Sequence, residues 1–343
     1  MLHAVMTTIQ RPTNSVRSLA RRLAGGNGHL VVAGDTKGPD SFDLSDVPGF
    51  AADQLSFVSI ADQLTTGFRL AGLLPTKHYS RKNIAYLLAI RRGASCVYET
   101  DDDNAPLDCW SARAERLSHC SHLESSETQG PRWVNVYRHF SDGLIWPRGL
   151  PLDRIHSMPV STPGADDVWA PIQQGLANGS PDVDAIWRLV LDCEFTFEDR
   201  ERVLLPPGQW CPFNTQTTWW WPVVYPLLYV PSFCSFRMCD IWKSFIAQRC
   251  LWELGTGVVF HAAEVWQERN VHNLLRDFSD EIPGYRENHR IAQILEETGL
   301  RAGPEHVAGN LQSCYQSLTE KGIFPPQELE LVAAWLEGVA GRE

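Results

Sequence analysis

The stretch SRKNIAYLLAIRRGASCVYETDDDN, residues 80–104, decides the fold. It opens on Ser80, a good helix-capping residue, and apolar residues then recur at helical spacing as far as about Arg92. A glycine stops this predicted helix, and residues 95–98 have the character of a buried strand that leads directly into the acidic segment 99–104. A helix that returns into such a strand is typical of a parallel sheet, where ligands bind beyond the carboxyl ends of the strands.

The residues before this stretch show the same alternation. Strands are expected at residues 3–9, 29–33 and 55–60, and a helix that Asn14 caps and that runs through Arg22 is expected between the first two. Alternating strands and helices predict an α/β fold with a Rossmann-like, doubly wound and mostly parallel sheet.

The second half of the chain is less regular until its end. Beyond Pro283, apolar residues recur at helical spacing, so we expect a ligand-binding domain at residues 1–285 and a helical C-terminal extension at 286–343 packed on it. The polar segment 107–129 predicts an exposed loop or lid. Within it, the spacing of His119-Cys120-Ser121-His122 matches no standard zinc pattern, which favours a polar loop.

Composition narrows the class of protein. The chain has 30 Lys and Arg against 41 Asp and Glu, a formal charge of −11, so no nucleic-acid partner is expected. No secretory signal is visible, and the apolar run 219–230 is short and broken by prolines, so no transmembrane segment is expected. Nine cysteines without a Cys-x-x-Cys pair favour reduced thiols and a cytoplasmic location.

The acidic segment supplies the candidate chemistry. Asp101 and Asp103 point the same way if the chain there is extended, and two carboxylates select a hard cation such as Mn2+ or Mg2+. A metal bridging phosphate oxygens assists the departure of a nucleoside diphosphate. The plain alternative is a solvated acidic loop. Arg81 and Lys82 oppose the dipole of the helix that they begin, and binding a diphosphate would explain their place.

Three ordered blocks of sequence resemble the STELLO glycosyltransferase-like family. They are residues 82–94 with 98–104, residues 182–189 with 212–216, and residues 235–252 with 269–273. The chain more distantly resembles the reversibly glycosylated polypeptides, which are UDP-arabinopyranose mutases, in residues 5–9, 101–103 and 148–154. Both resemblances imply a GT-A-type fold and a nucleotide-sugar ligand. The helical tail is expected to lie outside them.

The resemblance also implies roles for individual residues. Asp240 opens an acceptor-side helix and is expected to act as the general base, with a helix N-cap as the alternative. Arg148 is expected to contact phosphate or sugar, and His272 is expected as a third metal ligand beside Asp101 and Asp103; surface and structural roles are the alternatives. The other residues expected to bind the donor are Thr7, Thr8, Asp35, Lys37, Arg81, Lys82, Asn83, Asp102, Arg154 and Asn214. Residues 219–221, three tryptophans, are expected in the core rather than as a stacking platform for a sugar.

These expectations combine into one function. We expect a metal-dependent glycosyltransferase that moves a sugar from a nucleoside diphosphate donor to a hydroxyl of a glycan or small-molecule acceptor. UDP is the nucleotide that we expect first in this donor. The alternatives are a nucleotide-sugar mutase, which needs no acceptor, and a glycosyltransferase-like scaffold for polysaccharide synthesis that does no chemistry.

Overall fold

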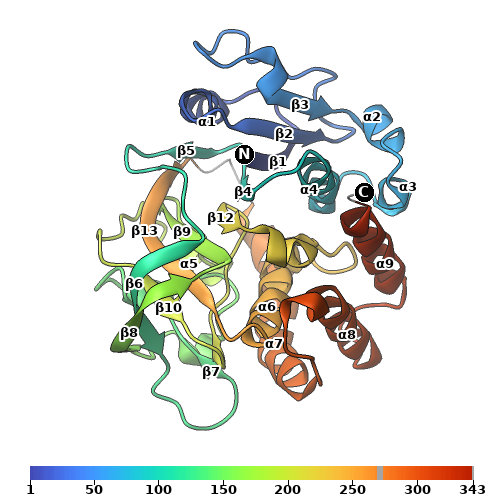
Figure 1. The fold of residues 1–343 in the computed structure, drawn as a ribbon. Coiled ribbons are helices and arrows are strands. Elements are labelled where there is room, and N and C mark those ends of the chain that lie inside the picture. Colours follow the sequence, from blue (N-terminus) through green and yellow to red (C-terminus); the bar gives the residue numbers. More distant parts are fainter. Residues whose placement is uncertain (269–272, 342–343) are drawn as a thin grey trace.

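The computed structural model describes residues 1–268 and 273–341 (Figure 1). The expected N-terminal alternation is confirmed. Four strands lie parallel in the order β3-β2-β1-β4. They are β1 (Leu2–Thr8), β2 (His29–Gly34), β3 (Leu55–Val58) and β4 (Cys96–Thr100). Because all four point the same way, residues 9, 35, 59 and 101 follow the same edge of the sheet, and this edge carries the candidate site.

The sheet continues beyond β4 with mixed directions. β12 (Thr217–Trp220) lies antiparallel to both β4 and β9 (Ile172–Gly179), and β13 (Val258–Gln267) then lies parallel to β9. The remaining strands of this sheet are β10 (Val203–Leu205), β6 (Arg116–Glu124), β8 (Val160–Trp169) and β5 (Asn104–Pro106), which pairs with β13. A separate ladder joins β7 (Arg132–Trp133) to β11 (Gln209–Trp210).

One sequence prediction here was wrong. The segment 107–129 is not a loop or lid throughout, because residues 116–124 form β6, which pairs with β8 and β10. Its buried residues, Leu117, Cys120 and Leu123, recur every third residue instead of every second, and the register with β8 shifts between Cys120 and His122. The segment therefore lacks the strict alternation by which a half-buried strand is predicted from sequence.

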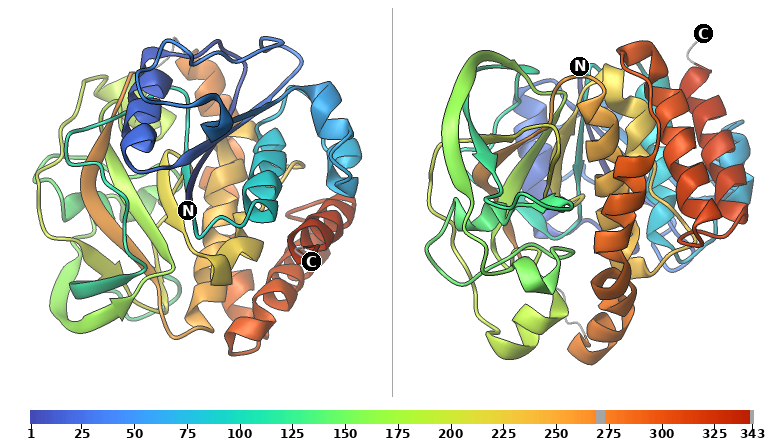
Figure 2. Two further views of the ribbon diagram at one scale, coloured as in Figure 1. Left: turned by 45° about the horizontal axis from the view of Figure 1, so that its top comes forward. Right: turned by 90° about the horizontal axis from the view of Figure 1, so that it is seen from below.

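Helices cover the sheet and form one flank of the molecule. The helices of the N-terminal half are α1 (Asn14–Gly25), α2 (Ile60–Leu64), α3 (Arg69–Leu73) and α4 (Lys82–Arg91). Those of the second half are α5 (Ala185–Val190), α6 (Cys239–Trp252), α7 (Leu274–Glu297), α8 (Val307–Glu320) and α9 (Gln327–Ala340). The last four lie side by side, with α8 and α9 at the outer side (Figure 2).

Short 3-10 turns connect these elements. They are η1 (Ala52–Gln54), η2 (Tyr79–Arg81), η3 (Val136–Arg138), η4 (Leu152–Arg154), η5 (Pro222–Leu228), η6 (Phe236–Met238) and η7 (Pro304–His306). Two predicted helix starts shift slightly because of their caps. Thr13, not Asn14, caps α1 by accepting from the Val16 N–H. Ser80 lies in η2 rather than capping α4, and its fully buried hydroxyl accepts a hydrogen bond from Ser232.

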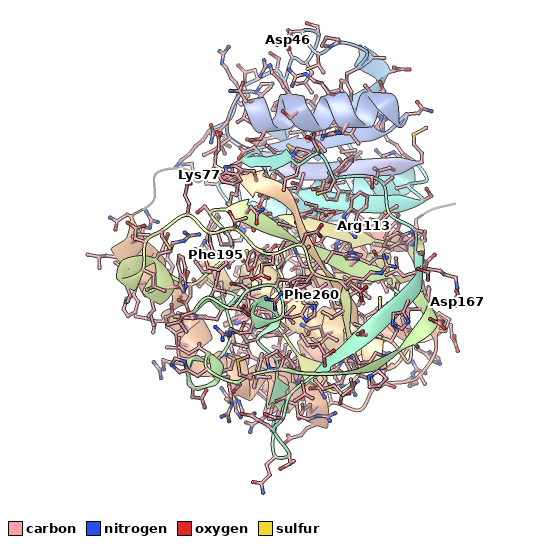
Figure 3. The ribbon with its side chains drawn as sticks, turned by 90° about the vertical axis from the view of Figure 1, so that its left-hand side faces the viewer. Asp46, Lys77, Arg113, Asp167, Phe195 and Phe260 are labelled. Atoms are coloured by element: carbon pink, nitrogen blue, oxygen red, sulfur yellow. The ribbon has the colours of Figure 1, made fainter. Side chains whose placement is uncertain are left out.

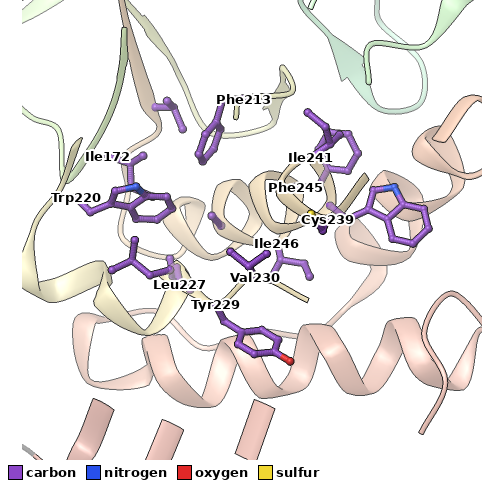
Figure 4. Close-up of a cluster of buried hydrophobic side chains, with 14 of the residues drawn as sticks. Ile172, Phe213, Trp220, Leu227, Tyr229, Val230, Cys239, Ile241, Phe245 and Ile246 are labelled. Atoms are coloured by element: carbon purple, nitrogen blue, oxygen red, sulfur yellow. The ribbon is translucent and has the colours of Figure 1, made fainter. Parts of the chain in front are cut away.

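The core is built around α6. This helix is buried along almost its whole length, and its apolar side chains pack against those of β9, β12 and η5 (Figure 4). Trp219, Trp220 and Trp221 are buried, so the prediction of core tryptophans is confirmed. Several polar groups inside the core are paired. Glu99, fully buried, accepts from Trp220 Nε1 at 2.8 Å and from Lys243 Nζ at 2.7 Å.

The predicted helical tail forms α7, α8 and α9. α7 runs through residues 285 and 286 without a break, so the proposed domain boundary falls inside a helix. The tail is tied to the rest of the chain by Glu328 of α9, which is fully buried and accepts from the backbone N–H groups of Ser232 and Phe233. The tail therefore shapes the loop that leads from η5 to α6.

Among the described residues, no helix combines the length and the hydropathy needed to cross a membrane.

Candidate functional site

A pocket of about 700 Å³ lies at the carboxyl ends of β1, β2 and β4. The turn 77–79 and the first turn of α6 close it from other sides. It brings together residues that are as far apart in the chain as Thr7 and Gln267. The predicted site residues that line it are Thr7, Thr8, Asp35, Lys37, Asp101, Asp102, Asp103, Arg148 and Asp240.

The three aspartates follow β4 in a turn, so the expected extended alternation is wrong. Each carboxylate instead meets a different element. Asp102 Oδ2 accepts from the hydroxyl of Thr8 at the end of β1. Asp103 Oδ2 accepts from Gln267 Nε2 at 3.2 Å, at the end of β13. The turn thus presents its carboxylates to one pocket, and hydrogen bonds to β1 and β13 hold two of them.

Two of these carboxyls are poorly solvated. Burial, and then the nearby Asp101 charge, raise the pKa of Asp103 to about 7. Burial also raises the pKa of Asp102, although the Thr8 hydroxyl opposes the shift. Lys82 forms an ion pair with Asp101, whereas no cation among the described residues pairs with Asp102 or Asp103. A bound cation would supply the missing positive charge, and carboxylate oxygens are ligands that Mg2+ and Mn2+ accept.

The aspartates do not form a complete metal cage. No group of three or more His, Cys, Asp and Glu side chains among the described residues is arranged to hold a metal ion. A magnesium-type ion is commonly bound by one or two carboxylates, with substrate phosphates and water completing its shell. The donor set fits that open kind of site. His272, the expected third ligand, lies outside the described residues.

Lys82 supports the site from behind. Its side chain is fully buried, and Nζ donates to Tyr79 Oη at 2.7 Å, to Asp101 Oδ1 at 3.0 Å and to the Thr100 carbonyl at 2.8 Å. Tyr79 Oη also donates to Asp101 Oδ1, at 2.5 Å. Lys82 is therefore not on the pocket surface, as a diphosphate ligand would be. It holds Asp101 in place.

Arg81 does not reach the pocket. Its guanidinium is buried and donates to the carbonyls of Ala71 at 2.9 Å and Leu74 at 2.6 Å, so the predicted contact with a diphosphate is wrong. Capping these carbonyls explains why an arginine begins α4 despite the helix dipole.

Three other predicted donor ligands also lie away from the pocket surface. Asn83 is fully buried and exchanges two hydrogen bonds with the backbone of Val230. Asn214 is buried behind the pocket, where its Oδ1 accepts from the Gln216 N–H at 3.0 Å. Arg154 forms an ion pair with Glu127 at 3.0 Å. Each of these side chains pairs with a backbone group or with an opposite charge inside the protein. A sequence pattern cannot distinguish this role from ligand binding.

Asp35 lines the pocket and also holds two backbone segments together. Its Oδ1 accepts from the N–H groups of Thr36 and Lys77, at 2.6 and 2.8 Å, and Oδ2 accepts from the His78 N–H at 3.0 Å. The end of β2 is thereby fastened to the turn before η2. Two exposed lysines, Lys37 and Lys77, flank this junction and line the pocket.

At the opposite wall, Arg148 joins two carboxylates. Its Nε donates to Asp182 Oδ1 at 2.8 Å, and its Nη2 donates to Asp240 Oδ2 at 2.7 Å. All three side chains are buried and line the pocket. Burial opposes ionisation of Asp182, yet Arg148 holds the pKa of this carboxyl below its usual range.

The N-cap alternative for Asp240 is wrong. Asp240 lies in the first turn of α6 rather than before it, and the cap position is Met238. Asp240 Oδ1 accepts from Arg148 Nη1 and from its neighbour Ile241 N–H, both at 3.0 Å. Oδ2 accepts only from Arg148 among the described residues, so it keeps a free lone pair, and the Asp240 side chain lines the pocket.

Sequence reasoning missed several residues of the site. Tyr79, Lys77, Asp182 and Gln267 line the pocket, and none of them stood out by spacing or local charge. Asp182 lay inside a block that carries the family resemblance, which was the one available signal.

Comparisons with known proteins extend this picture. A family model described as STELLO glycosyltransferases matches residues 237–340. Probable glycosyltransferase STELLO2 of Arabidopsis thaliana is 26% identical over 353 residues, and STELLO1 is 26% identical over 366 residues. Both alignments cover 97% of this chain. The chain is STELLO-like.

The STELLO-like chain spans less than half of these plant relatives, 44% of STELLO2 and 43% of STELLO1. The family model reaches residue 340, so the helical tail is part of the resemblance and the expectation that it lies outside was wrong. The predicted fold class and the resemblance to the STELLO family are confirmed, whereas the more distant resemblance to the reversibly glycosylated polypeptides stays a prediction.

Similarity to solved structures is more distant. A mycobacterial protein aligns with a TM-score of 0.38 and 11% identity, covering 86% of this chain and 73% of the other. Glucosyl-3-phosphoglycerate synthase from Mycobacterium tuberculosis, in complex with phosphoglyceric acid, aligns with a TM-score of 0.37 and 10% identity, covering 86% and 78%.

Proposed function

We propose that this STELLO-like chain transfers a sugar from a nucleoside diphosphate donor to a hydroxyl acceptor, with Mn2+ or Mg2+ as cofactor. A UDP-sugar is the donor that we propose first. The observation that carries the proposal is the turn 101–103. It presents three carboxyls to a pocket large enough for a nucleotide sugar, and two of them, Asp102 and Asp103, are desolvated and have no cationic partner among the described residues.

In this proposal Asp101 and Asp103 hold the metal, which supplies charge neutralisation of the departing diphosphate. The chain contributes positioning. Lys82 and Tyr79 fix Asp101, and Gln267 fixes Asp103. Thr7, Thr8 and Lys37, at the ends of β1 and β2, meet the nucleoside and its phosphates. Because hydrogen bonds hold Asp101 and Asp103 before the donor binds, these two carboxylates need little reorganisation when it does.

Asp240 acts on the acceptor side. Its Oδ2 has a free lone pair toward the pocket and receives the proton of the acceptor hydroxyl, while Arg148 fixes the orientation of the carboxylate. Asp240→Asn keeps the shape of the side chain but removes this base. Turnover should be lost while nucleotide affinity stays within about threefold of wild type.

The deciding experiment is calorimetric titration of UDP, GDP and CDP with and without Mn2+. Wild type should bind one nucleotide in a metal-dependent way, and Asp101→Ala/Asp103→Ala should lose that binding. Asp166→Ala is a matched control, because Asp166 is an exposed carboxylate on β8 that pairs with His119. Absence of binding for every nucleotide by the folded wild type would refute the proposal and favour a scaffold. Conversion of a nucleotide sugar without an acceptor would favour a mutase.

A further inference from the structure

The distribution of lysines in this chain is uneven. The sequence contains five, against 25 arginines, and a formal charge of −11. Two of the five, Lys82 and Lys243, are buried and engaged with Asp101 and Glu99. Lys321 is exposed at the end of α8. The other two both line one pocket.

Those two, Lys37 and Lys77, come from separate segments that a single carboxylate joins. Asp35 accepts from the backbone N–H of Lys77 at 2.8 Å, and the Asp35 carbonyl accepts from the Gly38 N–H at 2.7 Å, which closes the turn around Lys37. Both lysines therefore sit on backbone that is fixed at the end of β2. Figure 3 shows Lys77 at the outer margin of the molecule, below the layer that contains α1.

The backbone of Lys77 is unusual. Its φ is 57°, in the left-handed region that few residues other than glycine, asparagine and aspartate adopt. This conformation is strained for a lysine, because it brings Cβ close to the following carbonyl oxygen. The Asp35 carboxylate holds it by accepting from two consecutive N–H groups, those of Lys77 and His78. Asparagine would suit this backbone better, so backbone preference does not explain a lysine at this position.

The other cations of the pocket are already engaged. Arg148 pairs with Asp182 and Asp240, and Arg237 pairs with Glu281 at 2.8 Å. Neither Lys37 nor Lys77 forms an ion pair or side-chain hydrogen bond with any residue that the structure describes. Two unpaired ammonium groups beside a pocket lined by carboxylates fit a ligand that carries several negative charges of its own.

We infer that Lys77 and Lys37 form the phosphate-binding cations of this pocket, the role that the sequence assigned to Arg81 and Lys82. The inference rests on the proposed function and deepens it. The carboxylate turn takes the metal, and the two lysines neutralise the remaining charge of the nucleoside diphosphate. Lys77 is a binding residue for the phosphates, not for the nucleoside.

The test uses titration of the full chain with UDP, uridine and inorganic pyrophosphate in the presence of Mn2+. The variants are Lys77→Asn, which suits the left-handed backbone and so preserves folding, Lys37→Gln, and the double variant. Lys321→Gln is the matched control for loss of an exposed lysine. We expect Lys77→Asn to weaken binding of UDP and of pyrophosphate about tenfold, the double variant to weaken it further, and uridine binding to stay unchanged.

The outcomes separate the two proposals. If wild type binds no nucleoside diphosphate, the proposed function fails and this inference fails with it. If wild type binds UDP and Lys77→Asn binds it equally well, the inference alone is overturned. Equal loss of uridine and UDP binding also overturns it, because that result assigns Lys77 to the nucleoside or to the shape of the turn. A flatter salt dependence of UDP binding in the double variant supports it.

Discussion

Arg148 Nη2 lies 2.7 Å from Asp240 Oδ2, inside the wall of the pocket, and the same guanidinium holds Asp182 with its Nε at 2.8 Å. The arginine and both carboxylates have at most 9% of their side chains exposed. One buried cation therefore compensates two buried anions that come from distant parts of the chain. Each oxygen of the two carboxylates has a defined direction as a result.

Replacing Arg148 by methionine should destabilise the protein strongly. The side chain keeps its approximate length, but two buried carboxylates lose their cation, which costs about 4 kcal/mol of unfolding free energy. Urea unfolding followed by tryptophan fluorescence measures this change. Arg116→Met is the matched control, because Arg116 also makes a two-pronged pair, with Asp167, but at an exposed site. Its unfolding free energy should stay close to wild type. Equal losses of unfolding free energy in the two variants would contradict the conclusion that Arg148 compensates two buried carboxylates.

Glu328 in the helical tail should control the loop that leads to the pocket. It accepts from Tyr229 Oη and from the N–H groups of Ser232 and Phe233, and it is fully buried. Glu328→Ala leaves these donors unsatisfied, so we expect a loss of about 3 kcal/mol of unfolding free energy and faster proteolysis between residues 229 and 236. Limited digestion followed by mass spectrometry locates the cuts. Glu330→Gln, which removes an exposed partner of Arg69, should not increase cutting there.

His29 makes stability depend on pH. Burial, and then the Arg92 guanidinium, lower the pKa of His29 from 6.5 to about 4. The folded protein therefore binds fewer protons at this residue than the unfolded chain does. Its contribution to stability is complete above about pH 6.5 and is lost as the pH falls toward 4.

The measurement compares wild type with His29→Gln between pH 8 and pH 4.5. At pH 8 the imidazole is neutral in both states, so this point is the reference. Between these values wild type should lose about 1 kcal/mol more unfolding free energy than the variant, allowing for partial solvent screening of the site. His29 Nε2 lies 3.3 Å from Arg92 Nη1, which only donates, so Nε2 must be an unprotonated acceptor at neutral pH. Parallel pH profiles would show that His29 does not titrate differently on folding.

Local sequence was enough to predict the N-terminal half of the fold. The strands at residues 3–9 and 29–33 are short β-rich runs that end at turn residues, and the helix after Ser80 is a longer apolar run that ends at Gly93, so local signals mark each of them. The strand β6 was missed because its buried residues do not alternate with exposed ones, and its place is decided by pairing with β8 and β10, which come from later in the chain.

Acidic residues after a buried strand, at the ligand-binding edge of an α/β sheet, could be predicted without a structure, because strand direction and side-chain polarity are local properties. The family resemblance could be recognised in the same way. What each polar side chain does became clear from the packed structure alone. Arg81 and Lys82 are neighbours in sequence, yet Arg81 caps backbone carbonyls and Lys82 holds Asp101. Arg148 meets Asp182 and Asp240, which lie 34 and 92 residues away. Such long-range pairs depend on how the elements pack. A buried charged group is stable only when it has a partner, and no local sequence pattern specifies which residue that partner is.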